Sequence, residues 1–437
     1  MYVKIDDMTI CRYFRIIKPC CRMIAAIAAF AAILIFADSI PPTLASQTII
    51  INPRFWEVQS IDTMKYSRDL SREKLKDPSF DVVIDKQVKA IAETGATHVA
   101  ISTPYDEEFL PILKRWASAA RNYNLKIWFR GNWSGWEKWF DYKSISREEH
   151  IKKTKEFIIA NKDLFEDGDI FSACPECENG GPGDPRRTGD AEGFKSFLIS
   201  EYAATKKAFV EIGRSVASNY HPMNGDMARL IMDKETTTAL GGIVAIDHYV
   251  KDPEKLIQDI KDLHRQSGGK VVLAEFGAPI PDIHGKISDA DQAKWLESLL
   301  EKSIELPELI GLNYWVNVGG TTELWTEKGE AKPAVKVIER YFKPEILSGT
   351  IRNELDKPIA GATVLFHSKK AQTDEAGVFQ FPKISSQYES LNISADGYID
   401  QTIKTEKWNN GNIVILIKNM PTFWFRILRF FHNLLGW

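Results

Sequence analysis

Two glutamates follow closely on runs of apolar residues, where an acidic side chain is costly to bury without a purpose. Glu275 directly follows the run 271–274, and Glu176 comes just after the run 169–174, with Glu178 two residues further on. Hydrolysis of a glycosidic bond needs two carboxyl groups: one protonates the leaving oxygen, and the other attacks the sugar carbon or activates water. Glu275, together with either Glu176 or Glu178, is therefore a candidate for such a pair.

Further polar and aromatic residues follow neighbouring apolar runs and are suited to binding a sugar. They are Arg130, Trp133, Asn179, His248, Tyr249 and Trp315. Structural interpretations stand beside these roles: His248 could simply satisfy a hydrogen bond, Trp133 could pack its own loop, and Glu275 could be buried against an arginine. Arg130 could bind substrate or neutralise a catalytic carboxylate.

The elements that must position these residues alternate between short strands and helices, which is typical of a parallel α/β fold. The expected strands are 56–61, 98–102, 125–130, 169–174, 215–218, 242–246, 271–274 and 310–315. Helices are expected at 80–94 and 191–213, and a capping box at 146–149 opens another. Eight such units between residues 47 and 344 predict a TIM barrel, whose reactive groups gather where strands end. A doubly wound open sheet is the alternative, but no glycine-rich phosphate motif follows any of these strands.

The placement of the two glutamates at the fourth and seventh strand ends resembles clan A of the retaining glycoside hydrolases. The resemblance extends to His248-Tyr249 after the sixth strand and to Trp315 after the eighth. It implies that Glu275 is the nucleophile and Glu176 the acid/base residue. It also implies that a residue of the His-Tyr pair holds the nucleophile by a hydrogen bond and that Trp315 forms the floor of a sugar subsite.

One position departs from the clan pattern. Pro175 stands before Glu176, where the clan has an asparagine whose amide bonds the sugar 2-hydroxyl. Either Asn179 or Arg130 takes over that contact, or Glu178 is the acid. Counting from the start of the strand favours Glu176, which leaves Glu178 as a subsite ligand or a solvated loop carboxylate.

The pattern changes near Pro344, and residues 345–419 predict a second domain. Short alternating strands without a long helix are expected there, as in a small Ig-like antiparallel β-sandwich. The motifs Pro358-Ile359-Ala360-Gly361-Ala362, Thr373-Asp374-Glu375-Ala376-Gly377 and Ala395-Asp396-Gly397-Tyr398 resemble the carboxypeptidase regulatory-like family. This resemblance implies an accessory domain without catalytic residues of its own.

Both ends of the chain have membrane-related patterns. In residues 1–46, basic residues precede an apolar run from Met23 to Ala37, as in a removed signal peptide or an uncleaved N-terminal anchor. Either interpretation places the catalytic part outside the cytoplasm. Residues 420–437 are rich in aromatic and aliphatic side chains around Arg426 and Arg429, so they either lie in a membrane interface or pack on a domain.

Composition narrows the function classes. A net charge of −3 over 437 residues gives no electrostatic reason to expect a nucleic-acid partner. Outside the leader, the cysteines are Cys174 and Cys177, which form either a local disulfide or two free thiols. No strand-end cluster has metal-ligand spacing, so we expect neither a metal nor an organic cofactor.

These observations together predict a secreted or membrane-anchored retaining glycoside hydrolase that cleaves β-glycosidic bonds in an extracytoplasmic saccharide. Two alternatives stay open. One is an envelope protein that binds polysaccharide without cleaving it, which the proline at position 175 favours. The other is a glycosyl-transferring enzyme that remodels the envelope with the same residues.

Overall fold

The computed structural model describes residues 53–181, 183–384 and 390–419. The predicted leader and the apolar tail both lie outside these residues. No helix in the described ranges has the length and apolarity needed to cross a bilayer.

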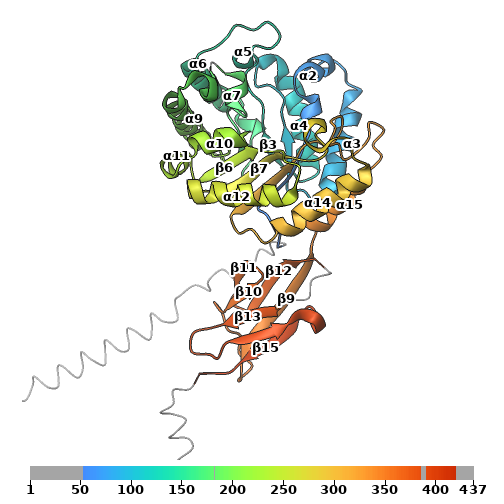
Figure 1. The fold of residues 1–437 in the computed structure, drawn as a ribbon, viewed down its shortest axis with the longest axis vertical. Coiled ribbons are helices and arrows are strands. Elements are labelled where there is room, and N and C mark those ends of the chain that lie inside the picture. The colour runs from blue at the N-terminus through green and yellow to red at the C-terminus, as the bar shows by residue number, and fades with distance from the viewer. Residues whose placement is uncertain (1–52, 182, 385–389, 420–437) are drawn as a thin grey trace, which may run out of the picture. The chain divides into compact units, whose positions relative to one another are not determined.

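Eight parallel strands form the core of the first domain (Figure 1). They are β1 (Val58–Asp62), β2 (His98–Ile101), β3 (Lys126–Phe129), β4 (Ile170–Phe171), β5 (Met223–Asn224), β6 (Ile243–Asp247), β7 (Lys270–Phe276) and β8 (Leu309–Tyr314). Their order is β4-β3-β2-β1-β8-β7-β6-β5. The predicted TIM barrel followed by an all-β sandwich is confirmed.

The barrel closes through the irregular segment 215–224. Ala217 forms a single parallel bridge with Ile170 of β4, while β5 itself pairs with β6. The fifth strand was expected at 215–218, but the two-residue strand comes later, at 223–224. Pro222 has no N–H to donate to a ladder, which accounts for the broken pairing between these two contacts.

Helices surround the strands on their outer side (Figure 1). The longer ones are α2 (Arg68–Lys74), α3 (Phe80–Glu93), α4 (Leu110–Asn122), α6 (Arg147–Ala160), α9 (Ala191–Glu211), α10 (Gly225–Ile231), α12 (Pro253–Ser267), α14 (Asp289–Ser303) and α15 (Pro333–Phe342). Helix α3 buries Phe80, Ile84, Val88 and Ile91, the face expected from their spacing. The side chain of Ser146 caps α6 by accepting a hydrogen bond from the Glu149 amide.

Two apolar layers hold the barrel together. Small and branched side chains from alternate strand positions, with Trp128, fill its interior; they include Val58, Ala100, Val272 and Ala274. A larger layer joins the outer strand faces to the helices. The rigid barrel that results fixes the strand ends, where the candidate site residues lie.

The second domain is a sandwich of two sheets. Its strands are β9 (Glu345–Asn353), β10 (Thr363–Phe366), β11 (Lys369–Gln372), β12 (Val378–Lys383), β13 (Ser390–Ser394), β14 (Gln401–Lys404) and β15 (Asn412–Leu416). The sheets have the orders β11-β10-β13-β14 and β12-β9-β15, and inward-facing residues such as Ile351, Val364, Phe379 and Leu391 form a core of their own. Pairing is antiparallel as expected, except that β15 lies parallel to β9.

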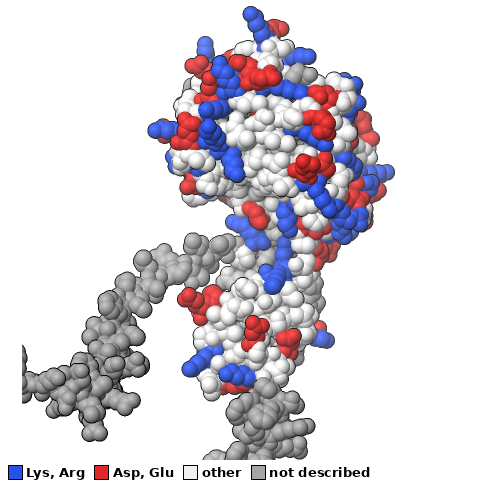
Figure 2. Space-filling view, turned by 90° about the vertical axis from the view of Figure 1, so that its left-hand side faces the viewer, with Lys and Arg blue, Asp and Glu red and all other residues white. Residues whose placement is uncertain are grey.

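The barrel surface mixes charges of both signs. Figure 2 shows Lys and Arg side chains interspersed with Asp and Glu over the face that it presents. That face therefore carries no single-sign field of the kind that draws in a polyanion.

Candidate active site

A cavity of about 470 Å³ opens at the carboxyl ends of the barrel strands. Its lining comes from the segments that follow β1 to β4: Met64, Ser67, Arg68, Ser102, Arg130, Asn132, Glu137, Trp139, Pro175, Glu176, Asn179 and Gly180. A cavity of this size, with many polar groups and one indole, suits a polar ligand such as a sugar unit.

Glu275 lies near the end of β7, in contact with the cavity-lining Arg130, and has 6% of its surface exposed. The register of β7 shifts against both β6 and β8 close to this residue, and such irregularities re-aim side chains. Its Oε1 accepts a 2.9 Å hydrogen bond from Arg130, and its Oε2 accepts one of 2.9 Å from the Tyr249 hydroxyl. Burial raises the pKa of Glu275 to about 7, against the opposing effect of Arg130.

Arg130 is a buried hub that joins three strand ends. Besides Glu275, its guanidinium donates to Asp62 at 2.9 Å, to Asp247 at 3.3 Å and to the carbonyl of Ala274 at 2.8 Å. Burial opposes its charge, but the surrounding carboxylates outweigh this effect and raise its pKa. With its donors engaged in this way, Arg130 is placed to orient Glu275.

The other two carboxyl groups around Arg130 are also buried. Burial raises the pKa of Asp62 and of Asp247, although Arg130 lowers both. Asn313 on β8 donates to Asp62 at 3.0 Å and to Ala274 at 2.8 Å. One guanidinium therefore faces three carboxyl groups, which favours retention of a proton within the cluster.

Glu176 follows β4 and precedes the short helix α7 (Cys177–Gly180). Its backbone is left-handed, with φ 46°, its N–H donates to the Pro222 carbonyl at 2.7 Å, and its residue lines the cavity. The negative charge of Glu176 raises the pKa of both Glu275 and Arg130. Glu176 and Glu275 are thus within electrostatic reach of each other.

Glu178, the alternative acid, is not among the residues that line the cavity. It is 4% exposed, and its Oε1 accepts a 2.7 Å hydrogen bond from the Asn224 amide of β5. Burial raises its pKa to about 7. Its contacts indicate that it ties α7 to β5, whereas Glu176 is the glutamate that reaches the cavity.

The structure brings three further predicted residues to the site. Tyr249 holds Glu275, as described, and its ring meets Trp315 edge-on with 6.1 Å between centroids. Trp315 is half-buried and its indole N–H points to the sulfur of Met64, which lines the cavity. Asn179 is exposed at the cavity rim, where its Oδ1 accepts from Asn224 at 3.3 Å.

Two other predicted residues lie elsewhere. Nε2 of His248 donates to Asp259 of α12 at 2.9 Å, and the ring packs on Gly225, so the side chain does not bond the Glu275 carboxylate; only the backbone N–H of His248 donates to the Glu275 carbonyl, at 2.9 Å. Trp133 is 7% exposed, and its indole N–H donates to Thr154 of α6 at 3.1 Å. The side chain of His248 is bonded to the buried carboxylate of Asp259, and the indole of Trp133 is bonded to Thr154 of α6. Neither side chain is part of the cavity lining.

Sequence reasoning missed Glu137, which lines the cavity beside Glu176. It lies in a short turn of helix, α5 (Ser134–Glu137), rather than directly after a strand. Burial raises its pKa to about 8, and Arg68 lies 3.3 Å away with its guanidinium over the ring of Trp139. Two tryptophans flanking a glutamate in the segment 136–139 were the available signal.

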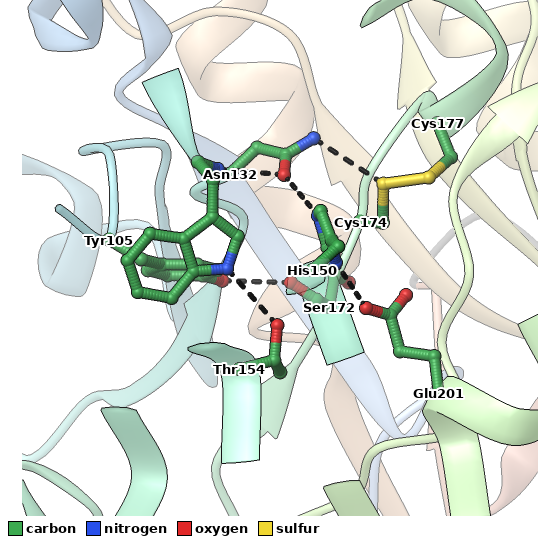
Figure 3. Close-up of a disulfide and its surroundings, with 9 residues drawn as sticks. Tyr105, Asn132, His150, Thr154, Ser172, Cys174, Cys177 and Glu201 are labelled. Atoms are coloured by element: carbon green, nitrogen blue, oxygen red, sulfur yellow. Dashed lines mark hydrogen bonds and ion pairs between the residues drawn. A yellow bond between two sulfur atoms is a disulfide. The ribbon is translucent and has the colours of Figure 1, made fainter. Parts of the chain in front are cut away.

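A disulfide joins Cys174 and Cys177 on either side of Glu176 (Figure 3). Cys174 belongs to a group with His150 and Glu201 whose potential ligand atoms lie within 4.8 Å of one another, the one such group among the described residues. As observed it is a hydrogen-bonded network, because the sulfur is bonded to Cys177 and both His150 nitrogens have partners.

Comparison with known proteins identifies no family. No family model and no curated protein matches the chain. Among solved structures, a GH5_18 variant from Streptomyces cattleya in complex with Manb1-4GlcNAc shares 13% identity, a TM-score of 0.49, and coverage of 68% of this chain and 85% of that one. A Bifidobacterium longum GH5_18 variant with the same ligand has 12% identity, a TM-score of 0.48, and 70% and 86% coverage.

A β-glucuronidase of Bacteroides uniformis has 11% identity, a TM-score of 0.46, and coverage of 83% of this chain and 46% of that one. The chain spans about half the length of such glucuronidases. At these identities and TM-scores, none of the similarities bears on the activity of this chain.

Proposed function

We propose that the chain is a retaining glycoside hydrolase that cleaves β-glycosidic bonds, with Glu275 as nucleophile and Glu176 as acid/base. The observation that carries the proposal is the fixed Glu275 carboxylate, bonded through one oxygen to Arg130 and through the other to Tyr249. Glu176 lines the adjoining cavity and acts electrostatically on the same arginine. A carboxyl pair of this kind is what glycoside hydrolysis requires.

In the first step, protonated Glu176 donates its proton to the glycosidic oxygen while the Glu275 carboxylate attacks the anomeric carbon. The bond to the leaving group breaks and a glycosyl ester on Glu275 forms. In the second step, Glu176 accepts a proton from water, whose oxygen displaces Glu275 from the sugar. Both carboxyl groups return to their starting states, and the sugar keeps its anomeric configuration.

The surroundings of the two glutamates support this division of roles. Arg130 donates directly to Glu275 and thereby favours its ionised form, while the charge of Glu176 opposes that form. A proton on Glu176 removes this repulsion. Arg130 is therefore placed to hold Glu275 in the ionised form that a nucleophile needs.

Pro175 leaves the sugar 2-hydroxyl without its usual amide, and Asn179 is the group we propose in its place. Asn179 follows Glu176 by one turn and reaches the cavity rim. Both terminal nitrogens of Arg130, the other candidate, already donate to carboxylates and a carbonyl, and its Nε is buried. Trp315 and Trp139 then offer aromatic surfaces on which a sugar can stack.

The remaining parts of the proposal concern the setting. We propose an extracytoplasmic location, through a leader in residues 1–46 that acts as a signal peptide or anchor. The seven-stranded sandwich is proposed to be a carboxypeptidase regulatory-like accessory domain. The apolar tail, residues 420–437, is proposed to bind a membrane surface, which fluorescence of its Trp residues with and without liposomes would test.

The main experiment is an activity screen on aryl β-glycosides, β-glucans and β-mannans with the wild type, Glu275→Gln and Glu176→Gln. We expect Glu275→Gln to lose at least about 10³-fold in kcat/KM on any substrate that the wild type cleaves. Glu108→Gln, at an ion pair with Arg72 outside the cavity lining, is the control and should keep full activity. Full activity in Glu275→Gln would overturn the assignment.

A second candidate function is polysaccharide binding without cleavage, favoured by Pro175 at a position where an amide would assist catalysis. Binding on a glycan array, with no hydrolysis of any bound glycan, would support this alternative. Transfer to an acceptor sugar uses the same residues, so product analysis separates it from hydrolysis.

A further inference from the structure

The proposed acid/base residue lies in the short loop between the two cysteines of the disulfide. Cys174 ends the stretch after β4, Cys177 opens α7, and their Cα atoms are 5.1 Å apart. Pro175 and Glu176 are the two residues between them. Both cysteines are buried, so the disulfide belongs to the packed core of the barrel domain and not to its surface.

Glu176 has a backbone conformation that needs to be held. Residues other than glycine rarely adopt a positive φ, yet Glu176 has φ 46°. Two backbone hydrogen bonds contribute, from its own N–H to Pro222 at 2.7 Å and from the Asn179 N–H to its carbonyl at 2.8 Å. The disulfide between Cys174 and Cys177 adds a covalent constraint on this backbone conformation to that of the two hydrogen bonds.

The disulfide is itself anchored by a buried chain of hydrogen bonds (Figure 3). Asn132, which follows β3, donates from Nδ2 to Cys174 Sγ at 3.5 Å. Its Oδ1 accepts from the Trp133 N–H at 2.8 Å, which fixes the orientation of the amide. The same oxygen lies 2.8 Å from Nε2 of His150 on α6, so that nitrogen must be the donor.

This series of hydrogen bonds ends at a buried carboxyl group. Nδ1 of His150 lies 2.5 Å from Oε1 of Glu201 on α9, and both side chains are fully buried. His150 is therefore hydrogen-bonded to Glu201 on one side and donates to Asn132 on the other. Helices α6 and α9 are thereby connected to the sulfur that adjoins the acid/base loop, while Asn132 also lines the cavity.

We propose that the Cys174–Cys177 disulfide, anchored by Asn132, is a positioning device for Glu176, so that acid catalysis depends on the oxidised chain. This inference rests on the proposed function. Reduction by a dithiol would transfer two electrons and two protons to the cysteine sulfurs and oxidise the dithiol to its own disulfide. The freed loop would let Glu176 leave its left-handed conformation, and the proton would no longer be aimed at the leaving oxygen.

The dependence of rate on the leaving group tests this inference. A phenyl β-glycoside needs a proton on its leaving oxygen, whereas a 2,4-dinitrophenyl β-glycoside does not, because its phenolate is a stable leaving group. Misplacement of the acid should therefore slow the first substrate and spare the second. A general loss of folding should slow both.

The informative variant is Cys177→Ala, which breaks the disulfide but keeps the Cys174 sulfur as acceptor for Asn132. We expect its kcat/KM to fall at least about tenfold on the phenyl glycoside and less than about twofold on the dinitrophenyl glycoside. Arg121→Gln is the structural control, because it removes an ion pair with Asp169 at the start of β4, away from the cavity lining. It should not change the ratio of the two rates.

Equal losses on both substrates, or no loss on either, would overturn the positioning role. If Cys177→Ala does not fold, the same ratio is measured on wild-type protein reduced with dithiothreitol, with thiols counted by alkylation and mass spectrometry. Glu176→Gln serves as the reference for the proposed function. If that variant shows no dependence on the leaving group, the acid/base assignment itself fails, whatever the disulfide does.

Discussion

At the residue scale, the proposed nucleophile Glu275 is subject to opposing effects on its pKa. Burial and the negative charge of Glu176 both raise the pKa of Glu275, which lies at about 7. Arg130 works in the opposite direction through its 2.9 Å hydrogen bond. Removal of the charge of Glu176 must therefore appear in the pH dependence of Glu275.

This coupling gives a prediction for the acid limb of the pH profile. Glu176→Gln removes a negative charge near Glu275, so the pKa of Glu275 falls and its ionised form persists to lower pH. On a 2,4-dinitrophenyl β-glycoside, which needs no acid, the rising limb of kcat/KM should shift to lower pH in the variant. An unchanged limb would show that Glu275 does not sense Glu176.

Tyr249 gives a second prediction at this scale. Tyr249→Phe removes the hydrogen bond to Oε2 of Glu275 and leaves that oxygen without its protein donor. A hydrogen bond to a charged group contributes about 1.5–3 kcal/mol, so kcat/KM should fall roughly 10- to 100-fold. Tyr123→Phe, whose hydroxyl bonds Asp85 at the surface, is the matched control and should keep wild-type kinetics. Wild-type kinetics in Tyr249→Phe as well would remove Tyr249 from the site.

Glu137 gives a prediction about stability rather than rate. Burial raises its pKa from 4.5 to about 8, so the folded state holds a proton that the unfolded chain releases above pH 4.5. The stability that it contributes is present below that pH and is lost as the pH rises toward 8. Denaturant unfolding at pH 5 and pH 8 should show a decline in the wild type that is smaller in Glu137→Gln. An equal decline in both proteins would show that Glu137 is ionised in the fold.

At the element scale, the short helix α7 controls where Glu176 lies. Its end packs closely on α5: a Cβ added at Gly181 would lie 2.2 Å from the Trp136 ring, and one at Gly180 would lie 2.5 Å from Glu137. Glu178 ties the helix to β5 through its hydrogen bond with the Asn224 amide. The helix therefore has little freedom to move without displacing the glutamate that precedes it.

Gly181→Ala tests this packing. The added methyl group should push α7 away from Trp136, and kcat/KM on a phenyl β-glycoside should fall at least about tenfold while the barrel stays folded. Gly213→Ala, at a glycine with nothing within 4 Å of the added Cβ, is the comparison. It should cost some stability because of its positive φ, but no activity. Similar kinetics for the two variants would contradict the close packing of α7.

The elements also show how far sequence reasoning reaches. Glu275 was predictable because a continuous apolar strand runs into it, and the periodicity of α3 gave its buried face. The fifth strand was misplaced because Pro222 interrupts its ladder and splits its pairing between β4 and β6. Glu137 was missed because it enters the cavity from a turn within a loop. The direction of His248 depends on Asp259, eleven positions further along the chain, and no strand pattern encodes it.

At the scale of the whole molecule, the barrel and the sandwich each have a hydrophobic core. All residues of the cavity lining belong to the barrel, and the sandwich core has its own inward-facing strand residues. Chemistry on a small soluble substrate should therefore need the barrel alone. The sandwich, the leader and the tail would then serve location and contact with a polymer.

Truncation after Lys343 tests this separation. The barrel fragment should hydrolyse a soluble aryl β-glycoside with kcat/KM within about threefold of the full chain, since no site residue is removed. A folded fragment, as judged by circular dichroism, with more than about tenfold lower activity would show that the sandwich contributes to the site.

The central claim is that Glu275 forms a covalent bond to the sugar, and trapping that bond tests it most directly. A 2-deoxy-2-fluoro glycoside of the sugar identified in the screen, with dinitrophenolate as leaving group, slows the second step more than the first. After peptic digestion and mass spectrometry, we predict one glycosylated peptide with the sugar on Glu275. Turnover of the parent substrate with the label on another carboxylate, or with no label, would contradict the account.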